Sequence, residues 1–462
     1  MLKVRNKRLY AKVRKFIIVT TELLQKIEAK EGLPRRTKYV FKEGGFEASE
    51  EAETDFFLFI FRHSKEIDEL PEFMDCAKYI FNNPTTRKQI GGLDKDGQPV
   101  KEIPFTLDYF RMLYSLLGTY LTRIGNLRFE DGSFEELYKE FERYFYISVL
   151  PYNVSAPILG LFGTIEKVGF SNNLRLRRFL DTEKDPYIRL LEFPFGFHTG
   201  LSAYDIASAQ YMIETTYYHK RGTTMDTSSC EKEFTDVMTA MRVFKSGRVG
   251  FPISKTEEVV WAPHSGRYFG QSRLVRIFPN SYELNESERI GLLRLWKRLK
   301  IFKQKVGSFE SGKYVNIALK RFNSGIDEDD FEDKIIDFLI AFEALYLLEP
   351  AELTYRLSNR VAILVGETDD DAEEIRKFMI KAYDLRSDIV HGKDVRPIKI
   401  EGKIIERNDF VKRIEEYLRV SLRLFIVLAR IHRKQANVLK ILDKSLIDAK
   451  SRRELRRMKT RM

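Results

Sequence analysis

The chain has 462 residues, of which 43% are hydrophobic and 32% charged, and this balance excludes a disordered or fibrous protein. The formal net charge of +11 is typical of proteins that bind polyanions, among which nucleic acid is the commonest. The two cysteines, Cys76 and Cys230, are far apart and have no CxxC partner. This excludes a disulfide framework and a thiolate zinc site, and it favours a reducing cytoplasm.

Both ends of the chain are basic. Positions 3–15 hold seven lysines and arginines and no acid, and seven more follow position 449 with Glu454 as the one acid. Such runs bind phosphates through charge and counterion release, and a solvated tail that aids solubility is the alternative. We predict a basic C-terminal tail over 436–462. Its predicted RNA contacts are Arg452, Arg453, Arg456 and Arg457.

Short apolar runs argue against a leader or a membrane anchor. Residues 16–19 are too few for the core of a signal peptide, and residues 424–429 are too few to span a bilayer. We therefore expect a soluble cytoplasmic protein that has no membrane partner.

The N-terminal region, residues 1–145, is predicted to be mixed but mainly helical. Residues 46–53 are polar and acidic, and the glycines and aspartates of 91–97 predict a loop. From 107 to 145 apolar residues recur at helical spacing.

Residues 146–285 have a different character. Runs rich in β-branched and aromatic residues predict short strands within 147–174 and at 211–218, 259–261 and 274–278. A helix over 232–244 is expected to pack on them. This region is predicted to be α+β with an antiparallel sheet. No motif gives it a chemistry, so we expect it to sense a trigger or to hold substrate.

From 286 to 435 the chain is predicted to be helical. An amphipathic helix is expected over 288–299 with Ser287 as its N-cap. The acids at 327–330 precede a helix over 331–348 that is apolar on most of its circumference, and Pro350 ends it. Further helices are predicted at 353–365, 372–390 and 408–432, with glycines at the breaks. The chain is thus predicted to be an α+β multidomain protein that ends in an all-α bundle.

The segment with the clearest chemistry lies at the end of the third bundle helix. Arg386 and His391 are five residues apart, about 140° around an ideal helix. The arginine side chain is long, and Gly392 lets the chain leave helical geometry, so the two can still reach one site. Ser387 stands four residues before His391 on the same face, where its hydroxyl can orient the ring or meet a phosphate.

Arginine and histidine suit the cleavage of RNA by its own 2′-hydroxyl. An imidazole moves protons near neutral pH, and a guanidinium keeps a fixed positive charge on the phosphate. Neither a metal nor a cofactor is expected, because no carboxylate cluster or histidine pair has metal-ligand spacing. Taken alone, the spacing also fits an exposed arginine and a helix-end histidine bonded to its own carbonyls.

Four nearby residues are predicted to support this pair. Glu343 lies among apolar residues and needs a partner if buried, either Arg386 or Arg360; the alternative is that it faces solvent at an open edge. We favour a structural ion pair over a catalytic part. Arg356, four residues before Arg360, either contacts RNA or pairs with Glu352. Asp388 is the fourth supporting residue.

Three stretches of the bundle together resemble the HEPN superfamily, and most of all its Apea-like prokaryotic branch. The stretches are DFLIAFEALY at 337–346, TYRLSNRVAILVG at 354–366 and YDLRSDIVHG at 383–392. The resemblance covers about residues 325–435 and keeps the order of an acid-bearing central helix, an arginine-bearing helix, the motif helix and a closing helix.

The resemblance implies an all-α HEPN domain that forms a homodimer through the motif helices. It implies metal-independent endoribonuclease activity on RNA, in some relatives transfer RNA, with His391 as the catalytic histidine and Arg386 on the phosphate. Ser387 fills a polar position where relatives often carry Asn, Asp or His. Many relatives are toxins or antiphage defence effectors, which implies a trigger or an antitoxin as a further partner. A non-catalytic dimeric RNA-binding or scaffold protein built on the same bundle is the alternative hypothesis.

Overall fold

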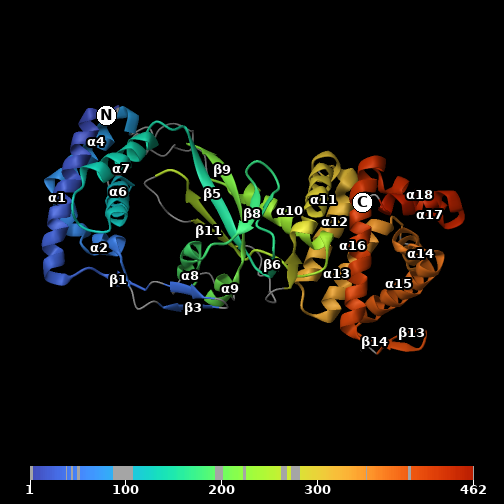
Figure 1. Ribbon diagram of the computed structural model, residues 1–462. Helices are drawn as coiled ribbons and strands as arrows, with labels where there is room; N and C mark the ends of the chain where they lie inside the picture. The colour runs from blue at the N-terminus through green and yellow to red at the C-terminus, as the bar shows by residue number, and fades with distance from the viewer. Residues whose placement is uncertain are drawn as a thin grey trace.

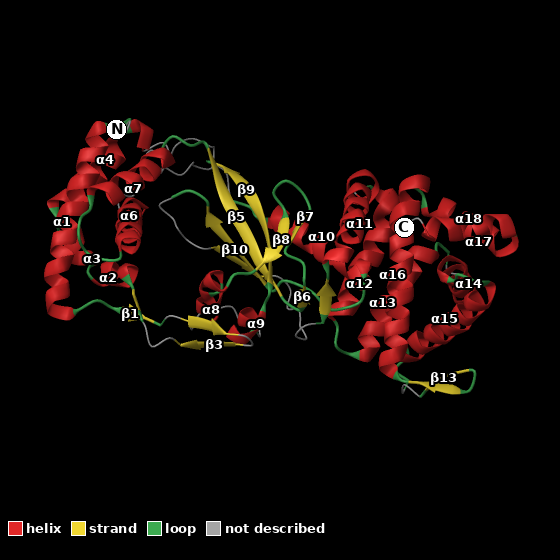
Figure 2. Ribbon diagram, in the orientation of Figure 1, coloured by secondary structure: helices red, strands yellow, loops and turns green. Residues whose placement is uncertain are grey.

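The computed structural model describes residues 4–37, 39–42, 45–48, 52–86, 108–192, 201–221, 225–261, 268–271, 281–307, 309–349, 351–393 and 397–460. The protein has the predicted α+β multidomain architecture and is mostly helical. A six-stranded sheet lies between two groups of helices, one at each end of an elongated molecule (Figure 1). Figure 2 shows that most of the strands lie in the middle part.

The N-terminal group of helices has its own hydrophobic core. Its helices are α1 (Lys7–Glu31), α2 (Phe56–Arg62), α3 (Ser64–Asp68), α4 (Pro71–Asn82), α6 (Asp108–Ile124) and α7 (Asp131–Tyr144). Two small antiparallel pairs follow α1 in the chain, β1 (Arg35–Arg36) with β4 (Glu53–Thr54) and β2 (Tyr39–Lys42) with β3 (Gly45–Ala48). The predicted helical character of this region is confirmed. The loop predicted at 91–97 lies outside the described residues.

The central sheet is antiparallel throughout, in the order β11-β10-β5-β9-β8-β7. Its strands are β5 (Val149–Ile158), β7 (Lys167–Gly169), β8 (Arg175–Arg178), β9 (Tyr211–Lys220), β10 (Ile253–Glu258) and β11 (Tyr268–Gln271). A separate parallel pair joins β6 (Leu161–Gly163) to β12 (Tyr282–Leu284). The helices of this part are η1 (Asp181–Glu183), α8 (Asp185–Glu192), α9 (Ala203–Ser208) and α10 (Ser228–Phe244).

The strand predicted at 211–218 and the helix predicted at 232–244 are confirmed as β9 and α10. The strand predicted at 259–261 is wrong, because β10 ends at Glu258. Trp261 instead packs against Phe141 and Tyr144 of α7, so this aromatic run marks a buried contact and not a strand. Residues 274–278, also predicted as a strand, lie outside the described residues.

The C-terminal part begins with η2 (Glu286–Glu288), α11 (Arg289–Phe302), η3 (Lys303–Gly307), η4 (Glu310–Gly312) and α12 (Lys313–Asp327). The four predicted helices follow as α13 (Phe331–Tyr346), α14 (Leu353–Val365), α15 (Asp369–Val390) and α16 (Arg407–His432), with the hairpin β13 (Ile398–Ile400) and β14 (Lys403–Ile405) before the last. The Asp330 and Thr368 side chains accept N–H bonds at the starts of α13 and α15. The prediction of Ser287 as an N-cap is wrong. Ser287 lies inside η2, and the N-cap of η2 is Asn285.

The segment predicted as a basic tail is folded. It forms α17 (Gln435–Ile447) and α18 (Ala449–Thr460), and apolar residues of both helices are buried in the core of the C-terminal part. Val438, Leu439 and Leu442 recur at helical spacing between the basic residues. The prediction of a tail relied on the basic residues and overlooked these apolar residues.

One hydrophobic core runs from Val154 in the sheet to Leu455 in α18. The boundary predicted between residues 285 and 286 therefore separates two parts that share a core. The buried guanidinium of Arg419, on α16, donates to the Arg242 carbonyl of α10 at 2.9 Å and ties the two parts together. In the described part of the chain, no helix is both long and apolar enough to cross a bilayer.

Candidate functional site

The end of α15 places Arg386 and His391 on successive turns. Tyr383 and Leu385 are buried and fix the helix against its neighbours, while the Arg386 side chain keeps 25% of its surface exposed. The His391 N–H donates to the Ser387 carbonyl at 3.1 Å and ends the helix, and Gly392 follows with φ +68°. Only glycine adopts this conformation readily, so the predicted change of direction after His391 is present.

Arg386 is held from α13. Its Nη2 atom lies 3.5 Å from Oε2 of Glu343, while its Nε is buried and has no hydrogen-bond partner among the described residues. Burial, followed by the charge of Glu343 and a hydrogen bond to it, raises the pKa of Tyr383 to about 12. Of the two partners left open for Glu343, the structure selects Arg386. The pair leaves several guanidinium N–H groups for a phosphate.

His391 is exposed, and no side chain that the structure describes bonds to its imidazole. Ser387, predicted to orient the ring, makes no side-chain hydrogen bond to it within the same set of residues. Asp388 pairs with Lys393 instead, with 2.8 Å from Nζ to Oδ1, and its carbonyl accepts the Lys393 N–H at 3.0 Å. Asp388 therefore stabilises the turn that follows His391.

Arg360, predicted to support the site, has a different role. Its guanidinium is buried and binds both carboxylate oxygens of Asp443 in α17, at 2.7 and 2.8 Å, and the Tyr346 carbonyl at 2.6 Å. Arg360 thus joins three helices and does not reach Glu343, a correction to the prediction. Arg356 pairs with Glu349 at 3.1 Å and with Glu352 at 3.6 Å, the ion-pair alternative of its two predicted roles.

The four arginines predicted to bind RNA divide into two pairs on α18. Arg452 and Arg456 both reach Asp369 at the start of α15, at 3.2 and 2.6 Å. Arg452 also donates to two carbonyls at the end of α17. Arg453 and Arg457 are exposed. Helix α18 therefore uses one pair to pack and presents the other to solvent.

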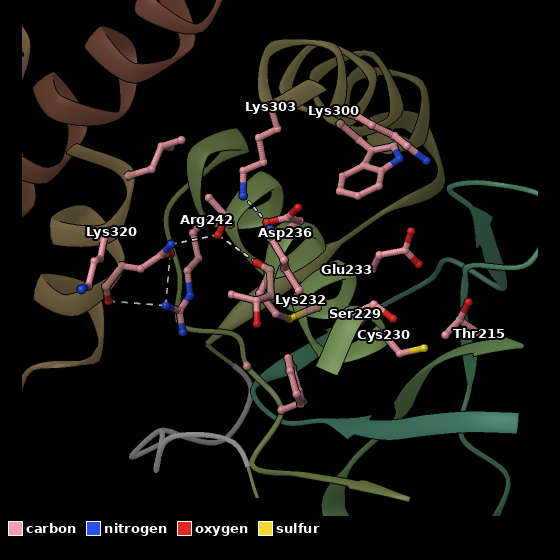
Figure 3. Close-up of a pocket in the computed structure, with 18 of the residues that line it drawn as sticks. Thr215, Ser229, Cys230, Lys232, Glu233, Asp236, Arg242, Lys300, Lys303 and Lys320 are labelled. Atoms are coloured by element: carbon pink, nitrogen blue, oxygen red, sulfur yellow. Dashed lines mark hydrogen bonds and ion pairs between the residues drawn. The ribbon is translucent and has the colours of Figure 1, made fainter. Parts of the chain in front are cut away.

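A groove of about 1350 Å³ opens between the sheet and the C-terminal helices (Figure 3). Side chains of β9, α10, α11, η3 and α12 line it, including Lys232, Lys300, Lys303 and Lys320. Sequence reasoning missed this surface. A signal was present, since residues 289–309 hold seven lysines and arginines and no acid.

Among the described residues, no group of three His, Cys, Asp or Glu side chains is arranged to hold a metal ion. No protein-family model, no curated protein and no solved structure matches the chain.

Proposed function

We propose that this protein is a metal-independent endoribonuclease of the HEPN type, with its HEPN bundle in helices α13 to α16. One observation carries the proposal: an exposed imidazole lies just past a half-buried guanidinium at the end of α15. The order of the helices agrees with the resemblance, and the pairing of Arg386 with Glu343 holds the guanidinium at the end of α15. In this proposal Glu343 is a positioning residue and does not touch the substrate.

In the proposed reaction the ribose 2′-oxygen attacks the adjacent phosphorus. The O2′–P bond forms while the P–O5′ bond breaks, and this yields a 2′,3′-cyclic phosphate and a free 5′-hydroxyl. His391 accepts the 2′-hydroxyl proton or gives a proton to the departing 5′-oxygen. Arg386 binds the phosphate oxygens and offsets their growing negative charge.

We propose a homodimer as the active form. A single protomer brings one exposed imidazole to the site, while the reaction uses both a proton acceptor and a proton donor. A second copy facing the first supplies the other. Val390, directly before His391, is 53% exposed and would lie at the contact between the two motif helices of such a dimer. The proposal extends to a toxin or antiphage effector, with the N-terminal and sheet parts as its sensor.

The test is to incubate the purified full chain with transfer RNA or total RNA in EDTA. We expect cleavage, and we expect His391→Ala and Arg386→Ala each to lower its rate at least ~100-fold. His432→Ala, a change at the end of α16, is the matched control and should keep wild-type activity.

Binding of RNA without any cleavage would overturn this proposal and favour the alternative, a dimeric RNA-binding or scaffold protein. Equal activity in His391→Ala and His432→Ala would also exclude the assignment of the site.

A further inference from the structure

The groove between the sheet and the C-terminal helices is built from three separate segments. Helix α10 forms its floor, α11 with η3 forms one wall, and α12 forms the other, with the end of β9 at one edge (Figure 3). Its volume of about 1350 Å³ exceeds the ~300–1,000 Å³ of ordinary small-molecule pockets. A segment of a polymer suits this space better than one small ligand.

Several charges in the groove are neutralised within the protein. Lys303 pairs with Asp236 across the two elements. The buried Arg242 binds Asp327 at 2.6 Å. These two ion pairs connect the elements that line the groove. They also neutralise the carboxylates of Asp236 and Asp327, which would otherwise repel an anion.

Three other cations of the groove have no such partner. No carboxylate among the described residues lies within ion-pair distance of Lys232, Lys300 or Lys320. Figure 3 shows Lys320 on one side of the hollow and Lys300 on the opposite side. Of the other carboxylates that line the groove, Asp337 pairs at 2.8 Å with Arg321, which is not a lining residue. Glu233 and Glu328 pair with none of the described cations, and Glu328 accepts the N–H groups of Asp329 and Asp330 at 2.9 and 3.3 Å. Three unpaired lysines therefore face two unpaired carboxylates in the groove, an excess of one positive charge.

Further exposed cations lie on α11 and η3 beyond the groove. Arg294, Lys297 and Lys305 are exposed and have no acidic partner in the described parts of the chain. Cations repeated along a helix in this way match the repeated charges of a phosphate backbone.

An aromatic ring completes the surface. Tyr218, on β9, lines the groove and keeps 59% of its surface exposed. An exposed ring beside a positive groove is the arrangement on which unpaired bases stack. A duplex keeps its bases inside and presents its phosphates on a convex surface, so this hollow fits a single strand better.

We propose that this groove binds single-stranded RNA, with the backbone on Lys232, Lys300 and Lys320 and a base on Tyr218. The inference rests on the proposed function in taking RNA as the polymer, and it deepens that function by adding a substrate-holding surface away from Arg386 and His391. The sheet part thereby contributes to holding the substrate.

The test measures binding separately from cleavage. Fluorescein-labelled oligouridylate is titrated with the full chain carrying His391→Ala, and fluorescence anisotropy is read at several salt concentrations. Adding Lys232→Ala, Lys300→Ala and Lys320→Ala together should weaken binding at least ~10-fold and reduce the salt slope by about 2, near 0.7 per lost phosphate contact. Tyr218→Ala should weaken binding about 10-fold and leave the salt slope unchanged.

The matched control carries Lys26→Ala, Lys78→Ala and Lys139→Ala, three exposed lysines of the N-terminal helices with the same loss of charge. It should bind within about 2-fold of its parent, as expected where no phosphate is contacted. Circular dichroism melting checks that both triple variants are folded.

Equal weakening in the two triple variants, or competition by duplex RNA as strong as by the single strand, would overturn the groove assignment. If the wild-type protein leaves the RNA uncut, only the nuclease proposal is refuted. The groove assignment is unaffected, because binding is measured independently of cleavage.

Discussion

Among individual residues, the two proposed reacting side chains are held to different degrees. Arg386 is confined by burial and by the Glu343 carboxylate, whereas His391 projects from the helix end. A fixed guanidinium costs little reorganisation when a phosphate arrives. The imidazole has to gain its partners from RNA or from a second protomer.

Replacing Arg360 tests its structural role. Arg360→Ala removes a buried fork that joins α14, α13 and α17, so we expect the free energy of unfolding to fall by about 2–3 kcal/mol. Arg356→Ala removes pairs with exposed acids and should cost less than about 1 kcal/mol. Urea unfolding of both variants checks this. Equal losses would show that Arg360 is not the tie that its contacts indicate.

Glu258, at the end of β10, gives a pH prediction. Burial raises the pKa of its carboxyl to about 7. In the unfolded chain the same group ionises near pH ~4.3, so folding opposes its ionisation between these values. The contribution of Glu258 to stability is therefore complete below about pH 4 and is lost as the pH rises through about 7.

Glu258→Gln should accordingly unfold at higher temperature than the wild type at about pH 8, by the equivalent of about 1–3 kcal/mol. The difference should vanish near pH ~4. Melting curves across this range give the answer, and a difference that does not depend on pH would refute the prediction.

Part of the candidate site could be predicted from the types of residue in the sequence. The link between Glu343 and Arg386 follows from a carboxylate in an apolar helix that needs a partner. The role of Arg360 does not, because its partner Asp443 lies 83 residues away in the segment read as a tail. Ion pairs between distant segments leave no local pattern.

Among the elements, helices with strong apolar periodicity were predicted most closely. Helices α13 to α16 match their predicted positions to within a few residues, because apolar stripes, caps and glycines agree there. The ends of strands were predicted less accurately. Trp261 continues a β-like run but packs on α7, a tertiary contact that composition does not reveal.

Helix α18 offers a paired test of charge against packing. Arg453→Ala removes one exposed cation and should weaken RNA binding about 2-fold while leaving the melting temperature unchanged. Arg452→Ala removes the same charge but breaks the contacts to Asp369 and to the end of α17. This second variant should melt at lower temperature. Anisotropy and calorimetry on both variants separate the effects, and identical profiles would refute the division.

At the scale of the whole molecule, the sheet and the C-terminal helices share one core, so they are not separate domains joined by a loose linker. The sequence predicted the helical and sheet parts as separate regions. It did not predict the groove, since its walls come from β9, α10, α11 and α12, which meet only after folding.

The proposed dimer is tested by sedimentation velocity. Wild-type protein at micromolar concentration should sediment as a dimer, and Val390→Asp should sediment as a monomer, because it places a charge in the proposed contact. Ile447→Asp, at an 89% exposed apolar residue of α17, is the control and should remain dimeric. A monomeric wild type would remove the second imidazole from the mechanism.

The most direct measurement is the chemistry of the RNA ends left by the purified protein in EDTA. We expect 2′,3′-cyclic phosphates and 5′-hydroxyls, no cleavage of the same RNA when every ribose carries a 2′-O-methyl group, and loss of these products in His391→Ala. Cleavage of the methylated RNA, or products with 3′-hydroxyl ends, would contradict attack by the 2′-hydroxyl and with it the roles given to Arg386 and His391.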